Sequence, residues 1–401
     1  MNLLGTEPAT DGRRESIWTR TFMLLCAVQF FGYAQHFVLQ PTFPLYITHL
    51  GGSPVIVGLV IASFGVASVL SRPVIGYWAD RWSETGVLIL GLLGQAASIS
   101  LCFIPSAGVT MFANGLRGIG WSGMTTGGYT LLATSAPADR RGEASGYYGA
   151  VQSCATILFP AVALWIIDAP FGGFHVAFIL AMSLALSGAL TGAALSRQVA
   201  RAPRRRQTER TESWWRDIVS VFDRDILLAA TLLFTSHLSL PCLTSFAVLY
   251  ARQLGIGHFG WFFVVTGVTS VLARPLLGRI SDRIGCGRSL IAAFTLESTA
   301  LMILSYSTSL FGMMFSGALY FMGSAIGGAR ILALAMENAP VERRGRAMAS
   351  FSVAFPLSNG LGALLNGLAV DLAGYSWMFI IAAVICACGL ALTAKNWSLL
   401  K

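Results

Sequence analysis

Long runs of apolar residues, separated by short polar stretches, make up most of the chain. Twelve runs are visible, at residues 18–40, 54–79, 86–104, 108–135, 145–167, 174–196, 226–250, 258–280, 288–306, 309–337, 347–370 and 376–395. Each is close to or above the roughly 20 residues that a helix needs to cross a bilayer, and none alternates like a barrel strand. Because lipid offers the backbone no hydrogen-bond partners, only helices fit this pattern. The sequence therefore predicts an all-α membrane protein with twelve transmembrane helices.

Two motifs occur twice along the chain at nearly the same spacing. RPVIGYWADR at residues 72–81 returns as RPLLGRISDR at 274–283, an offset of 202 residues. APADRRGEA at 136–144 returns as APVERRGRA at 339–347, an offset of 203 residues. The repeats predict an internal duplication into two pseudo-symmetric six-helix bundles. Six helices in each bundle give both the same orientation, so a pseudo-two-fold axis runs along the membrane normal.

The longest polar stretch lies between the two bundles and is rich in arginine. We predict an N-terminal six-helix bundle at 1–196, a cytoplasmic basic linker at 197–225 and a C-terminal six-helix bundle at 226–401. The second part of the linker has two interpretations, a helix lying in the membrane interface or an early start of the seventh transmembrane helix. The apolar residues that would share one face of an interfacial helix are Trp215, Ile218, Val219 and Phe222.

Charged residues are scarce and unevenly placed. Hydrophobic residues make up 55% of the chain and charged residues only 11%, far below the quarter that is typical of soluble proteins. The net charge of +9 comes from arginine clusters in alternate loops, which indicates membrane topology rather than nucleic-acid binding, because cationic loops stay in the cytoplasm. Both termini are therefore predicted to be cytoplasmic, in a bacterial inner membrane. The opposite loops hold essentially Arg252 alone, and Asp168, at the outer end of the fifth helix, is predicted to be a solvated loop charge.

The first repeated motif contains a Gly-x-x-x-Asp-Arg element after the second helix of each half. The element consists of Gly76, Asp80 and Arg81, and again of Gly278, Asp282 and Arg283. With this element, the six-plus-six layout and the long basic central loop, the chain resembles the major facilitator superfamily over essentially its whole length. The resemblance implies that family's fold, in which helices 1, 4, 7 and 10 line a central cavity, and it implies transport as the function.

The same resemblance implies a conformational latch at the cytoplasmic side. A carboxylate at the end of the second helix of each half can pair with the arginines of the second motif, and in the family such contacts hold the cytoplasmic side shut in the outward-open state. The alternative is that these are ordinary loop charges. The residues assigned to the latch are Asp80, Arg81, Arg140, Arg141, Asp282, Arg283, Arg343 and Arg344.

Three of the charged residues inside apolar runs are candidate functional residues. Arg117, in the fourth run, resembles the family's arginine at this place, which is tied to proton coupling. An arginine at membrane depth costs about 2.5–3.5 kcal/mol and needs a partner or a wet cavity, so we interpret it as a cavity or coupling residue, with a structural anchor as the alternative. Arg330, in the tenth run, is a candidate for substrate or anion contact. Glu297, near the middle of the ninth run, is a candidate proton carrier, since a buried carboxylate is costly unless protonated or paired.

Two histidines occupy corresponding places in the two halves. His36 in the first run precedes Pro41, and His237 in the seventh run precedes Pro241. A histidine in the central cavity would bind substrate or carry a proton, since its charge changes near neutral pH; the alternative is a packed hydrogen-bond donor. The residues expected to supply further polar contacts to an otherwise apolar pocket are Gln29, Tyr33, Gln35 and Gln40.

These features predict a secondary active transporter that moves a small organic molecule by alternating access, as proton-coupled efflux. The alternatives are a proton-coupled importer of a small metabolite, and a transport-inactive carrier-fold sensor or assembly factor. No metalloprotease, nucleotide-binding or hydrolase motif occurs, so the chain is not expected to be an enzyme. Its seven cysteines lack metal-ligand spacing. We expect no metal or cofactor, no nucleic acid, the substrate, protons and lipid as partners, and a monomer.

Overall fold

The computed structural model describes residues 16–137, 140–199, 227–338 and 344–400, and these residues form helices joined by short turns. The prediction of an all-helical protein with twelve membrane-length segments is confirmed. The first six are α1 (Arg20–His49), α2 (Pro54–Arg81), α3 (Glu84–Ser100), α4 (Ala107–Ser135), α5 (Arg141–Asp168) and α6 (Phe174–Val199). The seventh consists of α8 (Leu227–Leu238), the π-helical turn η4 (Cys242–Phe246) and α9 (Ala247–Gln253). The last five are α10 (Gly260–Ile284), α11 (Cys286–Tyr306), α12 (Leu310–Asn338), α13 (Arg344–Ala373) and α14 (Tyr375–Lys395).

Eleven of these segments are long and apolar enough to cross a membrane. The twelfth, α4, is less apolar because it carries Arg117, Asn114 and many glycines. It is nevertheless 29 residues long and packs between α2 and α3. Helix α6 runs to Val199, slightly past the predicted end of the first bundle. Most of the linker lies outside the described residues, and with it the two interpretations of its second part.

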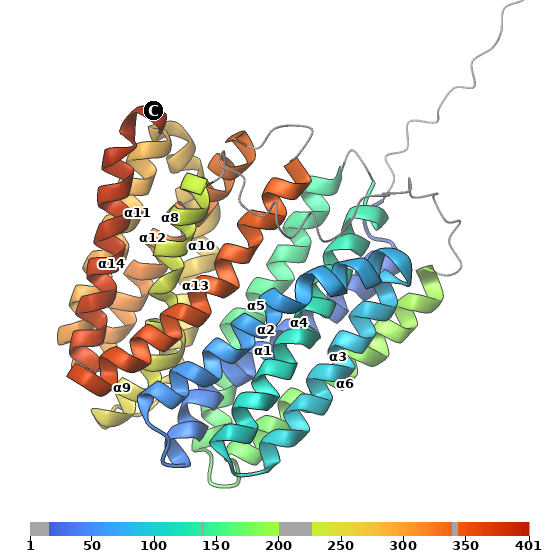
Figure 1. Cartoon of the computed structure of the whole chain (residues 1–401), viewed down its shortest axis with the longest axis horizontal. Coiled ribbons are helices and arrows are strands. Elements are labelled where there is room, and N and C mark those ends of the chain that lie inside the picture. Colours follow the sequence, from blue (N-terminus) through green and yellow to red (C-terminus); the bar gives the residue numbers. More distant parts are fainter. Residues whose placement is uncertain (1–15, 138–139, 200–226, 339–343, 401) are drawn as a thin grey trace, which may run out of the picture.

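The helices of each half pack mainly on one another. In the first half α1 contacts α5 and α6, and α4 contacts α2 and α3; in the second half α11 contacts α12 and α14, and α10 contacts α12. Figure 1 shows the two halves side by side. Helices α2 and α5 of the first half and α10 and α13 of the second half form the boundary between them. We call the end of the bundle where α1 begins and α14 ends the terminal face. The end formed by the turns after α1, α5 and α9 is called the opposite face.

Backbone contact between α2 and α13 joins the halves near the opposite face. A Cβ atom added to Gly58 would lie 2.5 Å from the carbonyl oxygen of Ala363, and one added to Gly367 would lie 2.4 Å from that of Pro54. The contact continues to the middle of α2, where a Cβ on Gly65 would lie 2.6 Å from the carbonyl oxygen of Pro356. Only glycine permits helices to approach so closely. These residues therefore let the two backbones touch without intervening side chains.

A second contact, between α5 and α10, joins the halves on the other side of the bundle. The rings of Trp165 and Trp261 meet edge to face with centroids 6.0 Å apart. Further along, a Cβ on Gly267 would lie 2.6 Å from the side chain of Ile157. At the middle of α5 the guanidinium of Arg274 donates to the hydroxyl of Ser153 at 3.3 Å. Like the α2–α13 contact, this one occupies the part of each helix nearer the opposite face.

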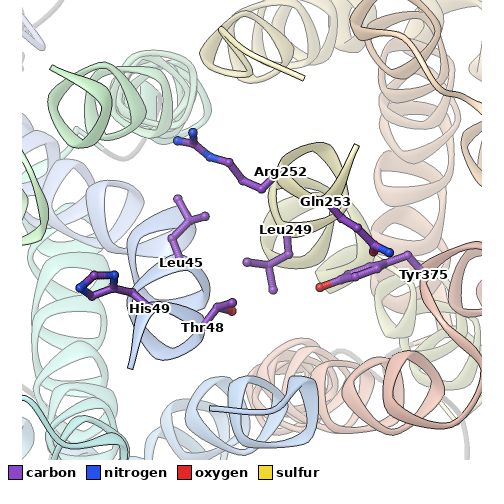
Figure 2. A pocket seen from close by; sticks show the side chains of 7 residues that line it. All are labelled: Leu45, Thr48, His49, Leu249, Arg252, Gln253 and Tyr375. Atoms are coloured by element: carbon purple, nitrogen blue, oxygen red, sulfur yellow. The ribbon is translucent and has the colours of Figure 1, made fainter. Parts of the chain in front are cut away.

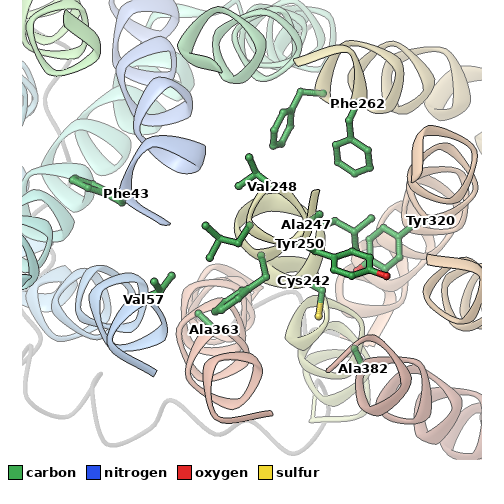
Figure 3. Close-up of a cluster of buried hydrophobic side chains, with 14 of the residues drawn as sticks. Phe43, Val57, Cys242, Ala247, Val248, Tyr250, Phe262, Tyr320, Ala363 and Ala382 are labelled. Atoms are coloured by element: carbon green, nitrogen blue, oxygen red, sulfur yellow. The ribbon is translucent and has the colours of Figure 1, made fainter. Parts of the chain in front are cut away.

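The hydrophobic core, like these contacts, joins the two halves nearer the opposite face. Its largest cluster joins residues of both halves, among them Phe43, Val57, Val248 and Ala363 (Figure 3). A second cluster, around Phe22 and neighbouring side chains, contains residues of the first half alone. In the part of α2, α5 and α10 nearer the terminal face, a Cβ added to any of four glycines would meet no atom within 4 Å: Gly76, Gly146, Gly149 and Gly278. The two halves are thus packed together through the opposite face.

We predict that Gly58→Leu separates the halves at the opposite face. The new side chain would meet the backbone of α13, which cannot rotate away, and overpacking of this kind costs about 1–3 kcal/mol, enough to shift a two-state equilibrium about 5- to 150-fold. Spin labels at Ser53 and Asp371, in a background without the accessible cysteines, would report a longer distance by double electron–electron resonance. Gly94→Leu, at an exposed position of α3 with open space and away from the contact between the halves, is the matched control and should leave the distance unchanged. An unchanged distance in Gly58→Leu would contradict the packing described here.

Candidate functional site

Arg117 lies near the middle of α4 and is buried, with 3% of its surface exposed. One terminal nitrogen, Nη1, donates to the side-chain oxygen of Asn114. The other, Nη2, lies 2.8 Å from Nδ1 of His36 on α1. Asn114 in turn donates to the carbonyl oxygen of Val60 on α2 at 2.6 Å. The structure therefore brings together two of the predicted site residues, Arg117 and His36, and adds Asn114, which the sequence analysis missed.

Aromatic rings surround this pair. The guanidinium carbon of Arg117 lies 4.9 Å from the ring centre of Phe64 and 5.3 Å from that of Phe43, within the range of cation–π attraction. The ring of Trp121 lies over His36, with centroids 4.4 Å apart. Such walls exclude water while stabilising a positive charge. The aromatic surroundings thus suit a flat or aromatic group with a polar end that contacts Arg117.

The positive charge of Arg117 has no carboxylate partner among the described residues. Three carboxylates pair with other arginines: Glu143 with Arg140, Asp168 with Arg252 and Glu337 with Arg330. In addition, the buried Nε of Arg117 has no hydrogen-bond partner. A buried cation without a counter-charge is costly. An anionic group that reaches this site would supply both the missing charge and the missing acceptor.

Two glutamines that were expected to line a pocket instead bind side chains within their own half. Gln35 donates to Gln95 on α3 at 2.5 Å, and Gln29 accepts from the hydroxyl of Tyr148 on α5 at 2.7 Å. Both glutamines are buried. They hold α1 against its neighbours, while Nε2 of Gln29 and Oε1 of Gln35 have no hydrogen-bond partner, so their contribution of polar contacts to a pocket stays a prediction.

Glu297 lies in a second buried polar cluster, inside the other half. Both oxygens of its carboxyl group accept from the hydroxyl of Ser236 on α8, at 2.9 and 3.1 Å. Next to it, the hydroxyl groups of Ser239 and Tyr320 lie 2.7 Å apart, and the thiol of Cys386 donates to Ser239 at 3.3 Å. The cluster draws on α8, α11, α12 and α14, and Glu297 is only 1% exposed. Ser236 and Glu297 correspond by the internal repeat to Gln35 and Gln95.

The remaining cavity candidates are less closely connected. His237 lies beside Ser236, its Nδ1 is 3.0 Å from the carbonyl oxygen of Leu233, and its ring packs on Phe355. No contact joins it to His36 among the described residues. Gln40 is half-buried, one residue before Pro41. Arg330 lies two turns before the end of α12 near the terminal face, 4.0 Å from Glu337, and so away from the Arg117 pair.

The predicted latch is described only in part. Arg81 ends α2 and lies over the ring of Tyr77 at 4.9 Å, while Arg140 pairs with Glu143 at 2.9 Å. Arg283 is exposed near the end of α10, and Asp80 ends α2 beside Arg81. The part of the assignment that falls outside the described residues or side chains comprises Arg141, Asp282, Arg343 and Arg344.

An ion pair at the opposite face crosses between the halves. Arg252 at the end of α9 pairs with Asp168 at the end of α5, although both side chains remain about 40% exposed, at 43% and 37%. The sequence analysis predicted that Asp168 is a solvated loop charge, whereas in the structure it pairs with Arg252. Beside the pair lies a pocket of about 470 Å³ lined from both halves (Figure 2). Its walls are formed by Leu45, Thr48, His49, Leu249, Arg252, Gln253 and Tyr375. Partly exposed ion pairs contribute about 0–1 kcal/mol, so this one can break at little cost.

Comparison with known families decides the identity of the fold. The sequence profile of the Major Facilitator Superfamily matches residues 25–259 and 246–396, which together cover most of the chain. The chain belongs to the Major Facilitator Superfamily. It is a multi-pass membrane protein of this transporter family, and the resemblance inferred from the repeated motifs is confirmed.

Relatives of this facilitator include proteins named for export. It is 20% identical to the staphylopine export protein of Staphylococcus aureus, over 91% of this chain and 93% of that protein. It is 25% identical to the multidrug resistance protein MdtG of Enterobacter lignolyticus, over 92% and 90% of the two chains. Among solved structures, a bacterial homologue of the human lysosomal transporter Spinster, inward-facing and unoccupied, matches with a TM-score of 0.72 at 12% identity, over 93% and 95% of the chains.

We predict that His36 and Arg117 of this facilitator are energetically coupled. Removing His36 leaves Nη2 of Arg117 buried without its partner, a loss of about 1–3 kcal/mol. His36→Leu should therefore lower the thermal unfolding temperature of the purified protein. The double variant His36→Leu/Arg117→Leu should lower the unfolding temperature by less than the sum of the decreases in the two single variants. Gln40→Leu, four residues along the same helix, is the control and should add independently to Arg117→Leu. Additive effects of His36→Leu and Arg117→Leu would contradict the coupling.

Proposed function

We propose that this protein is a secondary active transporter that exports a small organic molecule carrying an anionic group, coupled to protons, by alternating access. The observation that carries the proposal is the buried, unpaired cation of Arg117 at mid-depth in the bundle. A carboxylate or similar group would pair with this guanidinium through Nε. The rings of Phe43 and Phe64 would then contact the apolar body of the molecule.

Alternating access follows from where the halves touch. The contacts of α2 with α13 and of α5 with α10 close the opposite face, together with the Arg252–Asp168 pair. The arginine-rich loops favour a cytoplasmic location for the terminal face, in a bacterial inner membrane. Under that assignment the protein is in an inward-facing state, in which substrate reaches Arg117 from the cytoplasm. Rocking of the halves would then break the opposite-face contacts and bring the latch residues together.

Efflux is supported over uptake by the relatives that carry export or drug resistance in their names. A proton-coupled importer is the second candidate, because the same site and the same motion serve either direction. A carrier-fold sensor or assembly factor that transports nothing is a third. It is disfavoured by a buried cation that has no counter-charge, since such a charge is costly in a site that binds nothing.

The test is a comparison of metabolites inside and outside cells by untargeted mass spectrometry. The strains lack the gene, or carry it as wild type, Arg117→Gln or Arg279→Gln; Arg279, an exposed arginine on α10, serves as the matched control. We expect an organic anion that accumulates inside the deletion strain and is enriched outside cells expressing wild type or Arg279→Gln. Arg117→Gln should behave like the deletion, with export reduced about tenfold or more, because loss of a charged bond costs about 1.5–3 kcal/mol.

Other results of this comparison would change the proposal. A compound left in the medium by the deletion strain would establish uptake and overturn the direction. A transported compound without an anionic group, or full activity of Arg117→Gln at wild-type protein levels, would overturn the proposed role of Arg117. No difference between any of the strains would favour the sensor.

A further inference from the structure

Two arginines inside the bundle take no part in the site around Arg117. Arg72 on α2 and Arg274 on α10 are the first residues of the two copies of the repeated motif, so the internal repeat relates them. They lie nine and ten residues before the ends of their helices, which places both about 14–15 Å from the terminal ends of α2 and α10. An arginine at this depth in a membrane needs a partner or a wet cavity.

Arg274 lies at the open side of the boundary between the halves. Its Nη1 donates to the hydroxyl of Ser153 on α5 at 3.3 Å, and nearer the terminal face three glycines have open space around them: Gly146, Gly149 and Gly278. Arg274 is exposed, and no carboxylate pairs with it among the described side chains. An exposed cation that bridges the two halves faces a water-filled space between them, which we call the vestibule.

Arg72 approaches the vestibule from the first half. It lies within electrostatic range of two hydroxyl groups, those of Tyr33 on α1 and Tyr129 on α4. The hydroxyl of Tyr129 accepts from Nε2 of Gln152 at 3.2 Å, and Gln152 precedes the serine of α5 that binds Arg274. Polar contacts therefore lead along one wall from the first arginine of the repeat to the second.

Aromatic rings connect this wall to the Arg117 site. The ring of Trp121, which belongs to that site, lies 4.8 Å from the ring of Tyr33 between centroids. On α2, Arg72 follows Phe64 by eight residues, or about 12 Å along the helix axis, and Phe64 is the ring that packs on Arg117. The second pair of cations thus lies nearer the terminal face, and flat aromatic surfaces separate it from Arg117.

We propose that the transported molecule carries two anionic groups, one bound by Arg117 and the other by a second site that Arg72 and Arg274 form. The inference rests on the proposed export of an organic anion and narrows its substrate class to flat dianions. Guanidinium groups bind carboxylate or phosphate groups through paired hydrogen bonds, and Tyr33 and Trp121 contact the body between the two groups. Because Arg72 and Arg274 belong to different halves, an anionic group bound by both draws the halves together on the terminal side.

The test compares two probes of the same shape and different charge. p-Phenylenediacrylate is a flat aromatic molecule with a carboxylate at each end, and its monomethyl ester has only one. Their affinities for the purified full-length protein are measured by isothermal titration calorimetry at neutral pH. The wild type should bind the dicarboxylate about tenfold or more tightly than the ester, because a further charged hydrogen bond contributes that much.

Variants separate the second site from the first. Arg72→Gln and Arg274→Gln should each lower the preference for the dicarboxylate, and the double variant should bind both probes equally. Arg72→Lys keeps the charge and should retain the preference, and Arg279→Gln, on the same helix as Arg274, is the matched control and should behave as wild type. Arg117→Gln should weaken the binding of both probes. The exposed Arg274 carries the test if Arg72→Gln does not fold.

Equal binding of the two probes by the wild type, or an undiminished preference in Arg72→Gln/Arg274→Gln, would overturn the inference. Its failure is distinguishable from failure of the proposed function. An exported compound with a single anionic group, found by the metabolite comparison, would remove the second site alone. The expected binding pattern without any exported compound would support the second site and remove the proposed export. Binding of neither probe to the wild type would contradict the anion site at Arg117 and with it both proposals.

Discussion

A bilayer supplies no water, so every polar group within it must find its partner inside the protein. Many buried side chains of this facilitator follow that constraint with at least one bond, although Nε2 of Gln29, Oε1 of Gln35 and Nε2 of Gln95 have no hydrogen-bond partner. Gln35 binds Gln95, Gln29 binds Tyr148, and serine and threonine hydroxyls return to carbonyl oxygens of their own helices. The guanidinium of Arg117 differs from these neutral groups because it carries a charge and has no carboxylate partner among the described residues. We propose that the transported molecule supplies the counter-charge and the hydrogen-bond acceptor that Arg117 lacks.

The same constraint shapes the way in which the halves can move. Where two helices must separate and rejoin, polar side chains would be left without partners in each open state. At the contact of α2 with α13 the protein uses glycine and bare backbone, whose own hydrogen bonds stay within each helix. The one ion pair between the halves among the described residues, Arg252–Asp168, lies at the rim where water replaces the partner. The contacts that we propose to break in transport are thus those that cost least free energy to break.

The sequence predicted the features that depend on local composition. Runs of apolar residues gave the twelve segments, the repeated motifs gave the family, and Arg117 was identified because a charge at membrane depth is rare. His36 and Arg117 were both named, but their contact was not, since residues 81 positions apart show no mutual signal in one sequence.

The features that the sequence did not reveal are contacts between helices that lie far apart along the chain. The repeat relates Gln35 and Gln95 to Ser236 and Glu297, and aligning the halves in full would have suggested that each pair is in contact. The role of Gly58 and Gly367 and the pairing of Asp168 with Arg252 arise only when the halves are packed together. Which face is closed is likewise a property of one state of a moving protein, and no residue pattern specifies it.

The central claim is that the opposite-face contacts must open during transport. The most direct test is a reversible cross-link within the contact of α2 and α13, using cysteines at Ala62 and Gly360, where a Cβ on Gly360 lies 3.5 Å from Cα of Ala62 and meets no atom closer than 3.4 Å. The measurement is export of the compound found by the metabolite comparison, before and after oxidation. This account predicts that the disulfide stops export and that a reductant restores it, while either single cysteine has no such response. Export that continues with the disulfide fully formed would contradict it.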